Sequence, residues 1–148
     1  MTNLECFGAY AADFEQTYKD DDWSRLDRYF APDATYQVKG DPFTTNLKGR
    51  EAIFKGIKKS LDGFDRRFVT RDIALEGAPE VEGDTVSLPW AVTYNRAGNP
   101  PLVLRGRSSA KFADELIVEL TDSYEKPALE SVGAWMRQHG RDLDPSYT

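Results

Sequence analysis

The stretch Leu116-Ile-Val-Glu-Leu-Thr-Asp-Ser-Tyr124 alternates apolar and polar side chains with the period of two that is typical of a β-strand. The apolar face of this predicted strand consists of Leu116, Val118, Leu120, Asp122 and Tyr124. Because that face should point at the protein core, the strand places a carboxylate where apolar side chains are expected.

Asp122 is therefore the first candidate for a functional residue. A buried carboxylate is costly unless it is hydrogen-bonded, paired with a cation or protonated, and such groups are suited to acid–base chemistry. The alternative is a structural aspartate that an arginine or a backbone amide satisfies. The sequence alone leaves both interpretations open.

The size and charge of the chain limit its class. A chain of 148 residues fits one domain, here residues 1–148, which can bury about 70% of its unfolded surface without disulfides. A net charge of −6 argues against binding to nucleic acid or to an anionic membrane surface. The single cysteine and the absence of a signal-like or membrane-spanning run predict a cytoplasmic protein.

The sequence predicts no metal site and no cofactor. Cys6 and His139 are the only cysteine and histidine, which is too few for zinc. Neither a glycine-rich phosphate loop nor a nucleophile elbow occurs. His139 is expected to be a solvated residue at the end of the last helix.

The first half of the chain has the periodicity of helices, with one short strand. Apolar residues at helical spacing predict three helices, with buried stripes Leu4-Phe7-Ala11-Phe14-Tyr18, Trp23-Leu26-Phe30 and Ile53-Ile57-Leu61. Pro32 is expected to end the second helix. A short strand then follows, with Ala34, Tyr36 and Val38 on one face.

The second half has the pattern of a sheet. Strands are predicted at 68–75 with irregular alternation, at 85–95, at 102–112 and at 116–124, and a last helix begins at Pro127. Pro89 suggests a bulge or an edge, and Gly140 suggests a left-handed helix cap. The predicted fold is α+β: a strongly curved, cone-shaped antiparallel sheet covered by three N-terminal helices, with a C-terminal helix and a pocket between the layers.

The segment from Asp22 to Tyr36, with its Phe30-Ala-Pro-Asp-Ala34 core, resembles the helix-to-strand entry of the nuclear-transport-factor-2-like superfamily. The segments from Leu47 to Ile53 and from Leu116 to Glu125 are similar to its third helix and its final strand. This resemblance implies the cystatin-like cone fold, and it points to the branch with polyketide cyclases and ketosteroid isomerases.

Most of the functional positions of these relatives carry other residues here. In an ungapped match to ketosteroid isomerases, Phe14 replaces the oxyanion-binding tyrosine, Val38 replaces the general base, and Ser108 falls near the protonated aspartic acid. The histidine of polyketide cyclases also falls near Ser108. The last-strand aspartate of polyketide cyclases and of limonene-type epoxide hydrolases matches Asp122, so it alone is retained.

The predicted site therefore centres on Asp122 as a base, with Tyr94 or Ser108 as the partner of a developing oxyanion. Ser108 lies on the adjacent predicted strand and is expected to share a hydrogen bond with Asp122. The expected aromatic and substrate-binding residues are Phe14, Tyr18, Tyr36, Trp90 and Tyr124. The predicted ligand is a small apolar or carbonyl-containing molecule. Whether the chain is an isomerase, lyase or cyclase, a non-catalytic binding domain or a protein-interaction module is left open.

The outer face of the predicted sheet carries Val103, Arg105, Arg107 and Ile117, with Arg66, Arg67 and Arg71 nearby. This mixture of aliphatic and basic residues predicts a homodimer packed sheet to sheet, in which the arginines meet acids such as Glu119. A register shift at Pro89 or Gly106 would instead turn an arginine into the pocket, towards Asp122.

Overall fold

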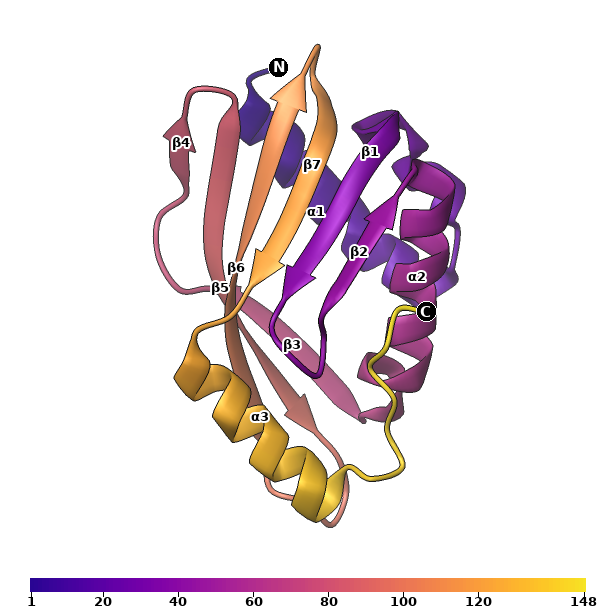
Figure 1. Ribbon diagram of the computed structural model, residues 1–148, viewed down its shortest axis with the longest axis vertical. Helices are drawn as coiled ribbons and strands as arrows, with labels where there is room; N and C mark the ends of the chain where they lie inside the picture. The colour runs from indigo at the N-terminus through magenta and orange to yellow at the C-terminus, as the bar shows by residue number, and fades with distance from the viewer.

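The computed structural model describes residues 1–148 and contains one strongly curved sheet with helices on one side (Figure 1). The strand order is β2-β1-β7-β6-β5-β3, and β4 pairs with β5. The strands are β1 (Phe30–Lys39), β2 (Thr45–Lys48), β3 (Thr70–Leu75), β4 (Glu80–Glu82), β5 (Thr85–Asn95), β6 (Leu102–Ala113) and β7 (Leu116–Ser123).

The helical segments cover one face of this sheet and one of its ends (Figure 1). They are α1 (Asn3–Asp20), η1 (Trp23–Tyr29), α2 (Arg50–Gly63), η2 (Asp65–Arg67) and α3 (Lys126–His139). A capping box between Thr2 and Glu5 starts α1, because each side chain accepts a hydrogen bond from the other residue's backbone amide. None of these helices has both the length and the apolar character needed to cross a bilayer.

The predicted α+β cone fold is confirmed. The strands β5, β6 and β7 form a continuous antiparallel meander, and their inward residues pack with α1 and α2 in one apolar core. One detail of the sheet differs from the prediction, because β1 joins β7 in parallel rather than antiparallel fashion. This parallel pair brings the N-terminal strand beside the strand that carries Asp122.

A bulge in β7 corrects the predicted faces of that strand. Ile117, expected on the outer face, is fully buried, whereas Leu116 and Val118 are partly exposed. The pairing with β6 shifts between Lys111 and Phe112, so Val118 has no partner on β6. The alternation of inward and outward side chains starts again after Val118. Beyond the bulge Asp122 has the predicted inward orientation.

Other predicted boundaries were wrong in detail. Phe30 starts β1 instead of ending a helix, and Pro32 lies within that strand. The strand β2 was not predicted at all. Gly140 ends α3 with a φ of −119°, so it is not a left-handed cap.

Pro89 lies at a gap in the edge of the sheet rather than at a bulge. The pairing of β5 with β6 runs through Pro89 without a shift, while β4 pairs with β5 only up to Ser87 and β3 pairs only from Trp90. The missing N–H of Pro89 therefore costs no ladder hydrogen bond on that side.

Neither arginine of the outer face enters the core. Arg105 and Arg107 form ion pairs with Glu76 and Glu80 of the same chain and remain accessible. The expected pairing with Glu119 across a dimer interface is therefore not needed to satisfy these arginines. The homodimer itself stays a prediction.

The C-terminal segment after α3 runs back along α2 (Figure 1). Ser60 donates a hydrogen bond of 2.7 Å to the carbonyl of Pro145, and the amide of Asp144 donates to the carbonyl of Gly63. A β-carbon on Gly63 would lie 2.0 Å from the carbonyl oxygen of Asp144. The absence of a side chain at Gly63 is therefore what lets the segment approach α2.

We expect Gly63→Ala to destabilise the protein by about 1–3 kcal/mol, because the docked backbone has to move away from the new methyl group. Gly8→Ala is the matched control, since a β-carbon at Gly8 meets nothing within 4 Å and should raise helix stability by about 0.5–1 kcal/mol. Urea unfolding of both variants measures the difference. Equal stability of the two variants would contradict the docking of the segment.

Candidate functional site

A cavity of about 460 Å³ lies between the inner face of the sheet and the helices α1 and α2. Of its 29 lining residues 21 are hydrophobic, so the space is suited to a mostly apolar ligand. The lining residues that are exposed come mainly from α1, such as Leu4, and from β3, such as Ile73 and Leu75. The cavity therefore opens to solvent between α1 and the edge strand β3.

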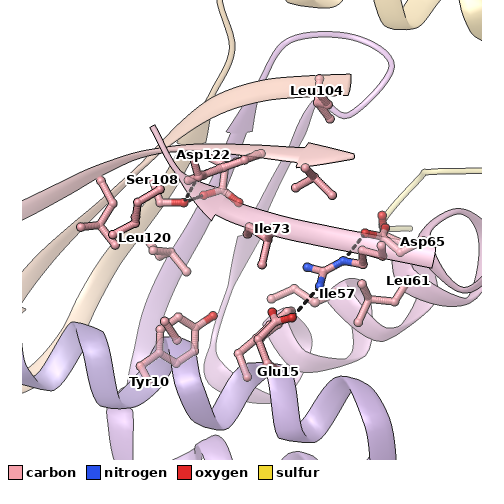
Figure 2. A pocket seen from close by; sticks show the side chains of 18 of the residues that line it. Tyr10, Glu15, Ile57, Leu61, Asp65, Ile73, Leu104, Ser108, Leu120 and Asp122 are labelled. Atoms are coloured by element: carbon pink, nitrogen blue, oxygen red, sulfur yellow. Dashed lines mark hydrogen bonds and ion pairs between the residues drawn. The ribbon is translucent and has the colours of Figure 1, made fainter. Parts of the chain in front are cut away.

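Asp122 projects into this cavity with both carboxylate oxygens bound (Figure 2). Ser108 donates a hydrogen bond of 2.5 Å to Oδ1, and Tyr36 donates one of 2.6 Å to Oδ2. The indole Nε1 of Trp90 donates to the Ser108 hydroxyl at 2.9 Å. Because Ser108 accepts from Trp90, its own proton is directed to Asp122.

The register of four strands assembles this group. Ser108 on β6 lies directly opposite Asp122 on β7, and Tyr36 on the parallel strand β1 is paired with Leu120. Trp90 on β5 is paired with Gly106, where a β-carbon would lie 2.8 Å from the indole ring. The glycine therefore lets the indole lie against β6 and reach Ser108 on the same face.

Burial raises the pKa of Asp122, and the hydrogen bonds from Ser108 and Tyr36 lower it by a smaller amount. Burial also raises the pKa of Tyr36 well above its usual value, and the neighbouring charge of Asp122 raises it further. Tyr36 therefore stays protonated and remains a donor. The result is a carboxylate that is fixed in position and has a higher affinity for a proton than an exposed aspartate.

A second polar group lines the cavity away from Asp122 (Figure 2). Arg71 on β3 donates from Nε to Asp65 at 3.0 Å and from Nη1 to Glu15 of α1 at 2.7 Å. The Tyr94 hydroxyl donates to the same Asp65 oxygen at 3.0 Å. The guanidinium also lies over the ring of Tyr18, 4.7 Å from its centroid.

Opposing effects act on the charges of this second group. Burial raises the pKa of Asp65, and the charge of Arg71 lowers it by a smaller amount. Burial opposes the charge on Arg71, but the two carboxylates outweigh it and raise the pKa of the guanidinium. Arg71 is therefore a permanent cation held between two acids.

The structure separates the predicted site residues into these two groups. Ser108 reaches Asp122 as expected, whereas the hydroxyl of Tyr94 binds Asp65 instead. Phe14, Tyr36, Trp90 and Tyr124 line the cavity as predicted. Tyr18 does not line the cavity, and its ring packs against the Arg71 guanidinium instead.

Sequence reasoning missed the second polar group. Arg71 was assigned to the outer face, yet only 9% of its side chain is exposed and it points inward opposite Tyr94. Arg71 alternates with Ile73 and Leu75, and this pattern was the available signal. No sequence pattern pointed to Asp65 and Glu15. They lie in η2 and α1, and only the folded chain brings them to Arg71.

The sequence also failed to indicate two phenols of the cavity and the hydrogen bond made by a third. Tyr36 was predicted only as an aromatic wall, although it is a direct donor to Asp122. Tyr10 of α1 and Tyr147 of the C-terminal segment line the cavity as well, and the ring of Tyr147 lies 5.8 Å from that of Tyr36. The structure contains no group of three or more His, Cys, Asp or Glu side chains that could hold a metal ion.

The curved sheet and its internal cavity have the architecture of the nuclear-transport-factor-2-like fold. The sequence pattern of the SnoaL-like domain matches residues 11–120, and the chain belongs to this family. The match ends two residues before Asp122. No curated protein matches the chain at the level of sequence.

Solved structures with this fold resemble the chain over nearly its whole length. A hypothetical protein with a ketosteroid isomerase-like fold from Catenulispora acidiphila DSM 44928, in complex with trimethylamine, is 22% identical with a TM-score of 0.63, covering 89% of this chain and 95% of its own. TerC co-crystallised with polyporic acid is 17% identical with a TM-score of 0.65, covering 88% and 98%.

A putative SnoaL-like polyketide cyclase from Shewanella denitrificans OS-217 is 14% identical, with a TM-score of 0.65, and the match covers 89% of this chain and 97% of the other. At these identities the similarity establishes the fold alone. The chemistry of the site depends on the residues of this chain.

We expect the pKa of Asp122 to lie above the value of about 3.9 for a free aspartate and to rise further in Ser108→Ala. The reason is that the variant removes a hydrogen bond to the charged form. Carbon-detected NMR titration of the side-chain carboxyl measures the shift.

Ser109→Ala is the matched control for this titration. Ser109 is the next residue on β6, and its hydroxyl shares a hydrogen bond of 2.8 Å with Ser87 rather than with Asp122. The control should leave the pKa of Asp122 unchanged. A wild-type pKa at or below the reference value would mean that Asp122 is a stably charged structural residue.

Proposed function

We propose that the protein binds a small, mostly apolar carbonyl compound and abstracts a proton from the carbon next to its carbonyl group, without a cofactor. The single observation that carries this proposal is the Asp122 carboxylate, which two hydroxyl donors fix inside an apolar cavity of about 460 Å³. A base with a raised pKa is matched to proton transfer closer to neutral pH.

In the proposed step an oxygen of Asp122 takes the proton of the α-carbon. The electron pair of the C–H bond moves into the carbon–carbon bond of an enolate, and the carbonyl oxygen becomes the oxyanion. Where the substrate has a double bond between its β- and γ-carbons, return of the proton to the γ-carbon gives isomerisation. Attack of the enolate on a second carbonyl of the same molecule gives cyclisation, and the alkoxide that forms takes the proton back from Asp122. Both outcomes balance without an oxidant or a reductant.

The oxyanion requires a donor whose proton is not already committed. Ser108 and Tyr94, the donors expected from the sequence, give their protons to Asp122 and Asp65. Tyr10, Tyr124 and Tyr147 line the cavity and donate to no protein acceptor, and the hydroxyl of Tyr10 points into the cavity (Figure 2). We assign the role of oxyanion donor to one of these three phenols.

The second candidate function is binding without catalysis. It is favoured by the replacement of the usual catalytic partners, since the histidine of similar polyketide cyclases falls near Ser108 in this chain, which has no histidine there. In that case Asp122 orients a ligand through a hydrogen bond and transfers no proton. Both functions use the same cavity, and an exchange experiment separates them.

We expect the protein to catalyse deuterium exchange at the α-carbons of 2-tetralone, an apolar bicyclic ketone, in D₂O. Asp122→Asn should lower the exchange rate by about 10²–10⁴-fold, because the amide cannot accept the proton. The rate should rise with pH through the raised pKa of Asp122 and level off above it, since the carboxylate is the active form. Proton NMR follows the loss of the α-proton signals.

Ser109→Ala should exchange like the wild type, and the slowest of Tyr10→Phe, Tyr124→Phe and Tyr147→Phe identifies the oxyanion donor. Binding of 2-tetralone without exchange above the buffer rate would favour the binding domain. Exchange that is equally fast in Asp122→Asn would remove Asp122 from the role of base.

A further inference from the structure

The charged side chains of the cavity form two separate groups. Ser108 and Asp122 lie on one side, Asp65 and Glu15 lie on the other, and Ile73 lies between them (Figure 2). The proposed chemistry uses only the Asp122 end. The group around Arg71 therefore has no role in the proposed proton transfer.

Arg71 has donors that the protein leaves unused. Its Nε binds Asp65 and its Nη1 binds Glu15, while Nη2 donates to no protein acceptor. Nevertheless 91% of the side chain is buried, as only 9% of it is exposed, and Nη2 is not among the polar atoms enclosed without a partner. Since Arg71 lines the cavity, the free donors of Nη2 are available to a molecule inside it.

The position of the guanidinium is fixed independently of any ligand. Asp65 and Glu15 hold it from η2 and α1, and the ring of Tyr18 packs against its face. Tyr94 binds the same Asp65 oxygen and so keeps that carboxylate in place. A pre-positioned donor of this kind adds affinity because no side chain has to be ordered on binding.

The charges of this group select against an anion. One guanidinium stands against the two carboxylates of Asp65 and Glu15, so the group is not positive when both acids are ionised. The ionised form of Asp122 adds further negative potential to the same cavity. A carboxylate on the ligand would meet repulsion, whereas a neutral carbonyl or hydroxyl oxygen can accept from Nη2 without it.

We infer that Arg71 forms a second binding subsite, which takes a neutral oxygen acceptor at the end of the ligand remote from Asp122. The substrate class is then an elongated, uncharged apolar molecule with one oxygen function at each end. This inference rests on the proposed function for the Asp122 end and extends it by a determinant of specificity. A single hydrogen bond from a charged donor in this setting is worth roughly tenfold or more in affinity.

The test uses pairs of neutral probes that differ only in the second oxygen. 1,4-Diacetylbenzene, 2,6-diacetylnaphthalene and 4,4′-diacetylbiphenyl provide three lengths, and each is compared with the analogue in which one acetyl group is replaced by ethyl. Isothermal titration calorimetry of the wild-type protein gives the ratio of Kd values for each pair. At the length that spans the cavity, the diketone should bind about tenfold more tightly.

The double variant Arg71→Met/Asp65→Asn should abolish this preference. Removing the cation together with one acid avoids leaving a buried carboxylate without a partner. Arg66→Met is the matched control, because Arg66 pairs with Asp62 and Asp21 and does not line the cavity. Thermal unfolding checks that both variants fold, and the wild-type ratios remain decisive if the double variant does not.

Equal affinity within all three pairs in the wild type would overturn the subsite, as would a preference that survives in a folded Arg71→Met/Asp65→Asn. Tighter binding of the analogues that carry a carboxylate in place of the second acetyl group would overturn the selection for a neutral end. Asp122→Asn should keep the preference, since it changes the opposite end. Failure of α-carbon exchange with this preference intact would count against the proposed catalysis and leave the subsite standing.

Discussion

The hydrogen bonds to the Asp122 carboxylate are the constraint to which the other features of the site are fitted. A carboxylate cannot lie in an apolar cavity without donors, and here they come from β1 and β6, with β5 supporting β6 through Trp90. A slip of one residue in any of these strands would turn its donor to the opposite face of the sheet. The need to satisfy one acid therefore specifies the register of the sheet along four neighbouring strands.

The same constraint explains why polar and apolar side chains are unevenly distributed along the cavity wall. The cavity lies in front of Asp122 on the inner face of the sheet. The helices cover this face with side chains that are mostly aromatic or aliphatic. Arg71 pairs with Asp65 and Glu15 away from Asp122, with Tyr94 donating to Asp65. Two polar groups separated by apolar walls give the proposed ligand a different environment at each end.

The C-terminal segment forms part of the cavity wall, although it does not belong to the sheet. Gly63 and Ser60 on α2 allow its backbone to dock closely, and Tyr147 then lines the cavity beside Tyr36. A residue close to the end of the chain thus becomes part of the site through contacts with a helix more than eighty positions earlier in the sequence. This dependence links the stability of the docked segment to the shape of the cavity.

The sequence by itself determined the α+β cone, the inward orientation of Asp122 and its contact with Ser108, because these follow from alternation along single strands and from the pairing of neighbours in a meander. Only the tertiary structure decided that Tyr36 binds Asp122 and that Tyr94 binds Asp65. The parallel pairing of β1 with β7, the bulge at Val118 and the meeting of Arg71 with Glu15 join elements distant in the chain. Local periodicity carries no information about such contacts, since it records which face a side chain occupies and not which other element will cover it.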